Sequence, residues 1–383
     1  MAVYKNLVKK ISISPDKKTK QKAYLKKGSL AIVDQGQSLI GGYTDDVNMA
    51  VECDLPVIVF GDHTRAVKYI TFPFGAGADG IKILQPKENV LPLFLYYATQ
   101  YIVAKMPDRG YARHYQYVEK ENLTVPSIPE QQRIVSRIEE LFSSLDNAVE
   151  TLRKTKEQLT VYRQAVLKEA FDSAEEDCKM LPIAEILTKT RKGMSTGPFG
   201  TMIKKSDHKA SGVPMLGIEN IGRGQFVDGN KIFVTEEKAE ELKSFSLTAG
   251  DIIISRSGTV GEICAVPERA EGSLLSTNLM RISLDNAIIR SDYFIALFQS
   301  KGIVLDQIKE LCKGSTRDFL NQTILKQIIF PVPSIERQAQ IVSIIEARMS
   351  VCDSIEQTVN TALAQAEAMR QSILKEAFEG RLV

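Results

Sequence analysis

The sequence predicts an α+β protein in which two globular domains are separated by two long antiparallel helices, which form a left-handed coiled coil with pseudo-two-fold symmetry. Three observations lead to this prediction. The chain has 383 residues, which is too long for one ordinary core. It contains a duplicated helical segment. The regions outside that segment are rich in short β-branched runs separated by glycine.

The duplication relates residues 125–171 to residues 332–378. The two segments align without a gap at an offset of 207, and 21 of the 47 pairs are identical. Their ends read RQAVLKEAF (163–171) and RQSILKEAF (370–378). A match of this length indicates an internal repeat.

Each copy predicts one long helix, because a proline-bearing stretch is followed by about 40 residues without an interior proline or glycine. Apolar positions then recur in steps of four and three, an average of about 3.5 residues, which indicates the seam of a left-handed coiled coil. The expected seam comprises Ile134, Ile138, Leu141, Leu145, Ala148, Leu152, Leu159, Tyr162 and Val166, and in the second copy Ile341, Ile345, Cys352, Ile355, Val359, Ala362, Ala366, Met369 and Ile373. Thr155 and Arg348 interrupt it.

The connectivity predicts how the helices pair. Two copies of a unit made of a globular domain and a helix, related by an approximate two-fold axis, pack their helices antiparallel and leave one domain near each end. A helix of 40 residues is roughly 60 Å long. Each copy of the RQ-x-x-LKEAF sequence is therefore expected beside the opposite globular domain, close to the start of the other helix.

The predicted domains are a first globular domain (1–124), a first helix (125–171), an acidic linker (172–178), a second globular domain (179–331), and a second helix with a C-terminal tail (332–383). Runs such as LPVIVFGDH and AGDIIISRSGTVGEICAV predict strands, whereas LPLFLYYATQYIV and SDYFIALFQSKGIVLDQI predict helices. The globular domains are expected to be distant relatives, with residues 27–32 matching 249–254 and RGYARHY (109–115) matching KGSTRDF (313–319).

Composition excludes several classes of protein. With 44% hydrophobic and 25% charged residues, the chain is typical of a folded soluble protein. No apolar run approaches the roughly 18 residues that span a bilayer, and the basic start lacks the apolar region of a signal peptide. We therefore expect a cytoplasmic protein with no membrane partner. The five cysteines are scattered, which predicts reduced thiols and neither a disulfide framework nor a zinc site.

No catalytic or metal-binding residue is predicted. GAGADG (75–80) matches the dinucleotide pattern GxGxxG, but IKILQP follows it and predicts a strand where that pattern requires a helix. Phosphate-binding GxxxxGK[ST], GxSxG and HExxH motifs are absent, and the three histidines are isolated. The chain is therefore expected to bind no cofactor.

Several loops offer hydrogen-bond donors suited to DNA. Arg, Asn and Gln form bidentate bonds with base edges, while Lys and backbone N–H groups suit phosphates. The stretch from Lys5 to Lys27 adds nine lysines against one acid. The alternative is that the loop residues only cap turns and satisfy buried carbonyls. The candidate DNA-binding residues are Gln35, Gln37, Thr44, His63, Thr64, Arg65, Lys68, Arg109, Arg113, His114, Tyr115, Phe199, Lys204, Lys205, Asn220, Arg223, Arg256, Ser257, Thr259 and Arg317.

The helix openings VPSIPEQQRIVSRIEELF and VPSIERQAQIVSIIEARM, the helix ends, and the order of domain, helix, domain and helix carry a family resemblance. The chain resembles the specificity (S) subunits of type I restriction-modification systems. GPFGT, AGDIIISRSGTVG and DQGQSLIGGYTDD are similar to the family's target-recognition segments. Two departures stand out: Glu336 and Arg337 replace Pro129 and Glu130, and the first helix lacks the GRLV tail.

The resemblance implies a non-catalytic DNA-recognition subunit. Each globular domain would be a target recognition domain for one half of an asymmetric bipartite site in double-stranded DNA, and the helices would set the gap and dock the methyltransferase subunits. Half-sites on one face of B-DNA lie about 34 Å apart. The implied partners are two modification (methyltransferase) subunits and two restriction (translocase and nuclease) subunits, with S-adenosylmethionine, ATP and Mg bound in those partners.

Two alternatives remain open from the sequence. One is a two-headed coiled-coil scaffold that binds protein partners. The other is a fragment of a modification enzyme, but the chain lacks the Asn/Asp-Pro-Pro-Tyr motif expected of an adenine methyltransferase.

Overall fold

A computed structural model of the chain describes residues 1–78, 80–107, 110–172, 178–200, 202–257, 260–300, 302–312 and 320–382. Its contacts divide the chain into two compact units. Unit 1 comprises Met1–Lys154 and Val359–Val383, and unit 2 comprises Thr155–Thr358. Each long helix therefore contributes residues to both units, whereas each predicted globular domain lies within one.

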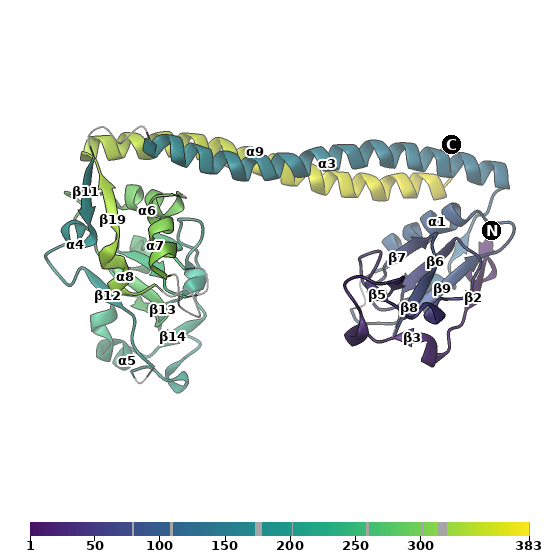
Figure 1. The fold of residues 1–383 in the computed structure, drawn as a ribbon, viewed down its shortest axis with the longest axis horizontal. Helices are drawn as coiled ribbons and strands as arrows, with labels where there is room; N and C mark the ends of the chain where they lie inside the picture. The colour runs from purple at the N-terminus through teal and green to yellow at the C-terminus, as the bar shows by residue number, and fades with distance from the viewer. Residues whose placement is uncertain are drawn as a thin grey trace. The chain divides into compact units, whose positions relative to one another are not determined.

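The globular domain of unit 1 is built on two described four-stranded sheets (Figure 1). One is antiparallel throughout, with the order β2-β9-β6-β7. The other has the order β3-β8-β4-β5, and β8 runs parallel to β3 and β4. The strands are β1 (Ala2–Val3), β2 (Val8–Ile11), β3 (Lys18–Thr19), β4 (Leu30–Val33), β5 (Gly42–Thr44), β6 (Val57–Gly61), β7 (Val67–Ile70), β8 (Phe74–Gly77), β9 (Ile81–Pro86) and β10 (Asn122–Leu123), and the helices are α1 (Pro92–Lys105) and α2 (Tyr115–Val118).

The globular domain of unit 2 repeats this plan in its described residues. An antiparallel sheet has the order β12-β18-β15-β16, and a mixed sheet has the order β14-β13-β17. The strands are β11 (Lys179–Pro182), β12 (Met194–Thr196), β13 (Val213–Leu216), β14 (Ile232–Val234), β15 (Ile252–Ser255), β16 (Ile263–Ala265), β17 (Leu274–Leu275), β18 (Leu279–Ile282) and β19 (Ile329–Val332), and the helices are α4 (Ile183–Ile186), α5 (Glu236–Glu241), α6 (Ser291–Gln299), α7 (Val304–Cys312) and α8 (Gln322–Gln327).

The two topologies correspond, as expected of related domains, but they correct the predicted alignment. β15 has the same neighbours and strand directions as β6, and β13 has those of β4. Residues 249–254 therefore correspond to the start of β6 and the residues before it, and the predicted match with residues 27–32 is wrong. A glycine before a short buried apolar run looks alike in every such strand, so local pattern does not distinguish them. The predicted match of RGYARHY with KGSTRDF lies partly outside the described residues.

The central strands β6 and β15 each divide two cores. Ile58 and Phe60 pack with α1, whereas Val57 and Val59 face the second sheet. Ile252 and Ile254 likewise pack with α6, and Ile253 faces β13 and β17. This alternation follows from the two-residue period of a strand.

One segment that was predicted to form a single helix forms two helices in the structure. The segment SDYFIALFQSKGIVLDQI forms α6 and α7 because Gly302 has a φ of 102°, which is unfavourable for other residues and incompatible with a continuous helix.

The duplicated segments form the long helices α3 (Ile128–Asp172) and α9 (Ile335–Phe378), as predicted. Each begins with half of a capping box. In α3 the Glu130 carboxylate accepts the Ser127 backbone N–H at 3.0 Å, whereas in α9 the Ser334 hydroxyl accepts the Arg337 N–H at 3.3 Å. The replacement of Glu130 by arginine in the second copy thus changes which half of the cap is made.

The end of α9 is a Schellman motif. Gly380 has a φ of 77°, its N–H donates to Ala377, and the Arg381 N–H donates to the Glu376 carbonyl at 2.8 Å. The tail then folds back within unit 1, because Leu382 packs against the core of that unit and Arg381 pairs with Glu376 and Glu379.

The two cores confirm where the repeated helix ends lie. Leu167, Ala170 and Phe171 belong to the core of unit 2, together with the start of α9. Leu374 and Ala377 belong to the core of unit 1, together with the start of α3. Each copy of RQ-x-x-LKEAF thus contacts the opposite globular domain, as expected from the connectivity.

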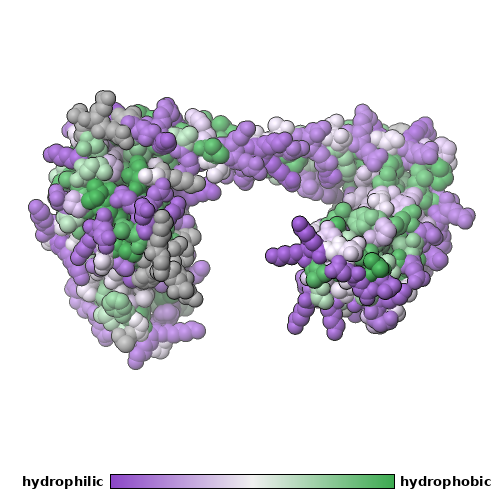
Figure 2. Space-filling view, viewed as in Figure 1, coloured by the Kyte–Doolittle hydropathy of each residue, from purple (hydrophilic) through white to green (hydrophobic). Residues whose placement is uncertain are grey.

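The predicted seam residues divide by exposure. Ile138, Leu159, Val166, Ile341, Ile345, Cys352, Val359 and Ala366 are buried, and Ile134, Leu141, Leu145, Leu152, Ala362 and Ile373 are partly buried. The structure differs at Tyr162, Ile355 and Met369, which are 49, 39 and 56% exposed, and at Ala148. The helices also pack on the globular domains near their ends, so the buried face moves off a strict 3.5-residue repeat and takes in Phe142, Leu167 and Leu374. Figure 2 shows that the visible face of the long helices is largely hydrophilic.

Candidate nucleic-acid interface

Two loops of unit 1, residues 34–37 after β4 and residues 62–66 between β6 and β7, are tied together by polar contacts. Lys68 is 4% exposed, and its Nζ donates to the Asp34 carbonyl at 2.8 Å and lies 3.6 Å from the Asp34 carboxylate. Burial lowers the pKa of Lys68, and the Asp34 carboxylate opposes that shift. The Thr64 hydroxyl donates to the Gln35 carbonyl, and Gln37 Nε2 donates to the Thr64 carbonyl at 3.2 Å. Lys68 and Thr64 therefore hold the loops.

The segment before and within α2 joins these loops through Asp62. The Asp62 carbonyl accepts the His114 N–H at 2.8 Å, and its carboxylate accepts the Tyr115 N–H at 2.9 Å and lies 3.3 Å from Lys82 Nζ. His114 and Tyr115 are 1 and 5% exposed. Burial raises the pKa of Tyr115 to about 12. His114 and Tyr115 are therefore buried beneath the loops and are not available to contact DNA directly.

An exposed tyrosine in this segment is absent from the candidate DNA-binding residues predicted from the sequence, whereas the ring it stacks on, His63, is one of them and is partly buried. Tyr111 is 84% exposed and stacks on His63, with ring centroids 4.4 Å apart and planes at 5°. His63 Nδ1 lies 3.1 Å from the Ala112 carbonyl, which holds the imidazole in place. Arg113 is exposed beside it, and Arg65 has a φ of 59°. The signal in the sequence is a tyrosine flanked by arginines in RGYARHY.

The lysine-rich segment of unit 1 is mostly at the surface. Lys5, Lys9, Lys10, Lys20, Lys22, Lys26 and Lys27 are exposed, whereas Lys17 pairs with Glu52 at 3.0 Å. Such a surface suits phosphates rather than base edges.

Two candidates in unit 2 are buried and hold turns. Asn220 is fully buried, accepts the Gly217 N–H at 2.9 Å, and donates to the carbonyls of Val227 and Gly229 at 3.0 and 3.3 Å. Arg256 is 7% exposed and donates to the carbonyls of Thr277 and Leu320 at 3.2 and 3.3 Å. Burial lowers the pKa of Arg256. At these positions the turn-holding alternative fits the geometry.

The remaining candidates lie nearer the surface. Gln37, Arg113, Phe199, Lys204, Lys205 and Arg223 are exposed, and Gln35, Thr44, His63, Thr64, Arg65 and Ser257 are partly buried. Phe199 is 62% exposed. The predictions for Arg109, Thr259 and Arg317 fall outside the described residues.

Two arginines of the repeated helix ends make matched contacts that the sequence analysis also missed. In unit 2, Arg163 of α3 pairs with Asp353 and Glu356 of α9 at 2.7 and 3.0 Å. In unit 1, Arg370 of α9 pairs with Asp146 of α3. Arg370 and Asp146 are the counterparts of Arg163 and Asp353 at the offset of 207, so identical charged residues in the repeat were the available signal.

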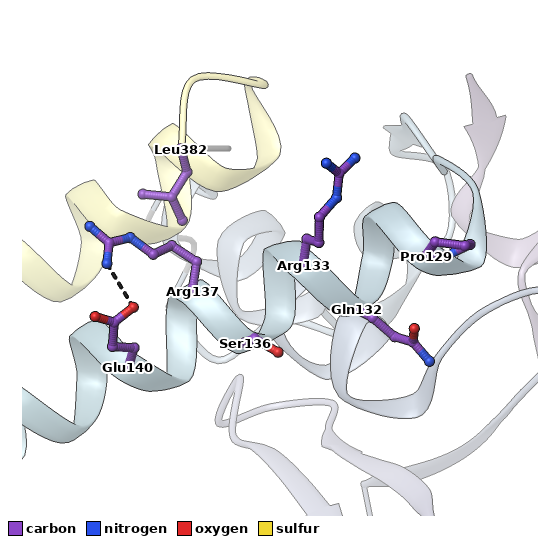
Figure 3. A pocket seen from close by; sticks show the side chains of 7 residues that line it. All are labelled: Pro129, Gln132, Arg133, Ser136, Arg137, Glu140 and Leu382. Carbon is purple, nitrogen blue, oxygen red and sulfur yellow. Dashed lines mark hydrogen bonds and ion pairs between the residues drawn. The ribbon is translucent and has the colours of Figure 1, made fainter.

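Unit 1 also carries an open groove at the start of α3 (Figure 3). It is lined by Pro129, Gln132, Arg133, Ser136, Arg137 and Glu140 of α3 and by Leu382 of the C-terminal tail. Arg137 and Glu140 form an ion pair of 2.7 Å within it.

Neither a metal site nor a membrane span emerges from the described part of the chain. No group of three or more His, Cys, Asp or Glu residues there is arranged to hold a metal ion, and no described helix is both long and apolar enough to cross a bilayer. The described strands β8 and β9 follow one another around GAGADG, so the helix that a dinucleotide site requires does not occur there.

Comparison with known protein families identifies part of the chain. The model of the type I restriction modification DNA specificity domain matches residues 183–365. The matched residues make up just under half of the chain. The match confirms the resemblance predicted from the sequence, and the specificity domain begins at α4, includes most of the second globular domain, and ends within α9.

Relatives of the specificity domain extend the likeness beyond residues 183–365. The type I restriction enzyme EcoKI specificity subunit of Escherichia coli K12 is 28% identical over 283 residues, covering 68% of this chain and 58% of that protein. The StySPI specificity subunit of Salmonella potsdam is 26% identical over 273 residues, with the same two coverages. The chain thus spans 58% of the length of these curated relatives.

Two solved structures share the fold of the specificity domain and of the rest of the chain. A chain from a structure described as the basis of complex assembly and conformational transition of the type I R-M system has a TM-score of 0.74 at 15% identity, covering 99% of this chain and 97% of that chain. The HsdS subunit from Thermoanaerobacter tengcongensis has a TM-score of 0.52 at 15% identity, covering 99 and 96%.

Proposed function

We propose that this chain is the DNA sequence-specificity subunit of a type I restriction-modification complex. One observation carries the proposal: the two globular domains share one strand topology but present different loop residues, and most of the second lies within the specificity domain. Shared topology with divergent loops is the arrangement expected of two domains that recognise different targets by one mode, because loops on a rigid scaffold carry function.

Each globular domain would recognise one half of an asymmetric bipartite site in double-stranded DNA. In unit 1 the proposed contacts are Gln37, Arg113 and the His63–Tyr111 pair, with the exposed lysines on phosphates. In unit 2 they are Phe199, Lys204, Lys205 and Arg223. Because these sets differ, the half-sites should differ. Lys68, His114, Tyr115, Asn220 and Arg256 would act by holding the loops.

The long helices would form an antiparallel left-handed coiled coil that sets the gap between half-sites and docks the methyltransferase subunits. The matched pairs Arg163–Asp353 and Arg370–Asp146 support antiparallel pairing, because each joins the end of one helix to the other helix in its first half. The partly apolar repeat supports coiled-coil packing.

The complex would supply all chemistry through its partners. Two modification subunits would carry S-adenosylmethionine and methylate adenine, and two restriction subunits would use ATP and Mg to translocate and cleave DNA. The chain itself would be non-catalytic and would bind no cofactor.

The test is to map methylated adenines in cells that express the cognate modification subunits with and without this chain. The expected result is a new methylated motif in two unlike parts separated by a fixed gap, present only with the chain. An unchanged methylation pattern would contradict the proposal, and binding of protein partners without any new motif would support a scaffold instead.

A further inference from the structure

Two fully buried glutamines occupy the same position in the two copies of the repeat. Gln131 lies in the first turn of α3, and Gln338 lies in the first turn of α9; each is 0% exposed. They are related by the offset of 207. Their neighbours differ, since Glu130 and Gln132 correspond to Arg337 and Ala339. The glutamine is thus retained where the residues around it have changed.

In unit 1 Gln131 joins three backbone groups. Its Oε1 accepts the N–H of Leu91, the N-cap of α1, at 2.8 Å. Its Nε2 donates to the carbonyl of Asn89 at 3.1 Å and to that of Pro126 at 2.9 Å. One carboxamide therefore links the start of α3 to the start of the helix that covers the central sheet.

In unit 2 Gln338 makes the same three bonds with the corresponding groups. Its Oε1 accepts the N–H of Arg290, the N-cap of α6, at 2.8 Å. Its Nε2 donates to the carbonyl of Ile288 at 3.0 Å and to that of Pro333 at 2.9 Å. The two junctions are therefore equivalent bond for bond.

Only a primary amide of this length fits both junctions. The site requires one acceptor and two donors on one terminal group, which a carboxylate lacks because it only accepts, and which an aliphatic or thioether side chain lacks altogether. Asparagine is one methylene shorter. Other identical polar pairs of the repeat, such as Ser136 with Ser343 and Lys168 with Lys375, are exposed and carry no such requirement.

We propose that Gln131 and Gln338 are positioning residues that lock the angle between each globular domain and the start of its long helix, and so determine the gap length that the chain accepts between half-sites. The inference rests on the proposed function. A shift of about 3.4 Å along the duplex is a full base-pair step. A junction held by three directional bonds resists the rotation that would move the loops by that distance, whereas apolar packing is non-directional and resists it less.

The experiment uses the full complex of this chain with its cognate modification subunits. Gln131→Met and Gln338→Met keep the length of the side chain and remove all three bonds. The two single variants and the double variant are made. Exposed glutamines supply matched controls one or two positions away, Gln132→Met and Gln340→Met. Adenine methylation is measured on DNA in which the natural half-sites are separated by the natural gap or by one base pair more or less.

Wild-type protein and both controls should methylate one gap only. Each Gln→Met variant should keep the same half-site bases, while methylation at the altered gaps, relative to the natural gap, should rise at least about tenfold, because loss of one of the three bonds already corresponds to that ratio. An unchanged gap preference in the single variants would overturn the positioning role even if their melting temperatures fall, as would a change in the half-site bases. If wild-type protein methylates no two-part motif, the proposed function fails instead.

Discussion

The two units agree in the contacts that the long helices make with each other and with the globular domains, and they differ where the loops reach solvent. Arg163 with Asp353 in unit 2 repeats Arg370 with Asp146 in unit 1, and Gln338 repeats Gln131. The loop after β6 instead carries a half-buried His63 under an exposed tyrosine, whereas Arg256, just after β15, is buried and bonded to carbonyls. The duplication has therefore kept its junctions and changed its loop surfaces.

The junctions are nevertheless not identical in every contact. Arg163 is 18% exposed and reaches a second carboxylate, Glu356. Arg370 is 30% exposed and instead lies over the Phe142 ring, 4.3 Å from its centroid. Valine occupies the position in unit 1 that Glu356 holds in unit 2. The two units therefore share the Arg–Asp pair but differ in the second contact that each arginine makes. Substitutions can measure how far the two units are equivalent.

The largest expected effect is at the matched leucines of the repeated helix ends. Leu167 and Leu374 are 2 and 1% exposed, so Leu167→Ala and Leu374→Ala should each lower the free energy of unfolding by about 2–5 kcal/mol. Urea denaturation measures this. Tyr162→Ala and Met369→Ala, at matched exposed positions, should stay within about 0.5 kcal/mol. A large difference between the two leucines would show that the junctions are not equivalent in packing.

A smaller effect is expected at the matched ion pairs. Double-mutant cycles of Arg163→Gln with Asp353→Asn, and of Arg370→Gln with Asp146→Asn, should each give a coupling of about 0.2–1 kcal/mol, because both aspartates are exposed. Arg163→Gln alone should cost more than Arg370→Gln, because Arg163 is less exposed and loses two carboxylates. Coupling in one cycle and none in the other would restrict the pairing to one unit.

The smallest effect is expected in the acid response of the matched glutamates. Arg348 hydrogen-bonds Glu169 and Arg381 hydrogen-bonds Glu376, and each bond lowers the pKa of the carboxyl below its ordinary value of 4.5. A lowered folded-state pKa adds stability above the ordinary value that is lost as the pH falls through the folded value. The melting temperature should therefore fall less on acidification in Arg348→Gln and Arg381→Gln than in the wild type. An equal fall would mean that these exposed pairs add nothing.

The helices were predictable from the sequence because their signals are local. Proline and serine mark the starts, the interiors lack glycine and proline, and the offset of 207 aligns the copies residue by residue. The position of each RQ-x-x-LKEAF copy beside the opposite domain, close to the start of the other helix, followed from connectivity alone. Gln131 was within reach too, since it is an identical amide in two otherwise different helix openings.

The loop chemistry was not predictable to the same degree. Lys68, Asn220 and Arg256 carry the donors that DNA contact requires, yet these donors bond to protein carbonyls. Lys68 and Arg256 reach residues distant in sequence, such as Asp34 for Lys68, and Asn220 bonds within its own turn. Whether a donor is already hydrogen-bonded within the protein depends on which loops pack against each other in the folded chain. The same limitation produced the misaligned strands, because β4 and β15 share a local pattern but differ in their neighbours.

The sequence by itself determined the duplicated architecture, its two long helices and its resemblance to specificity subunits, because helix periodicity, internal repetition and motifs are properties of the chain alone. Only the tertiary structure decided which polar side chains lie at the surface and which hold the loops, and it alone revealed that Gln131 and Gln338 make the same three bonds. Hydrogen-bond partners far apart in the chain are specified by packing, and packing is a property of the folded molecule.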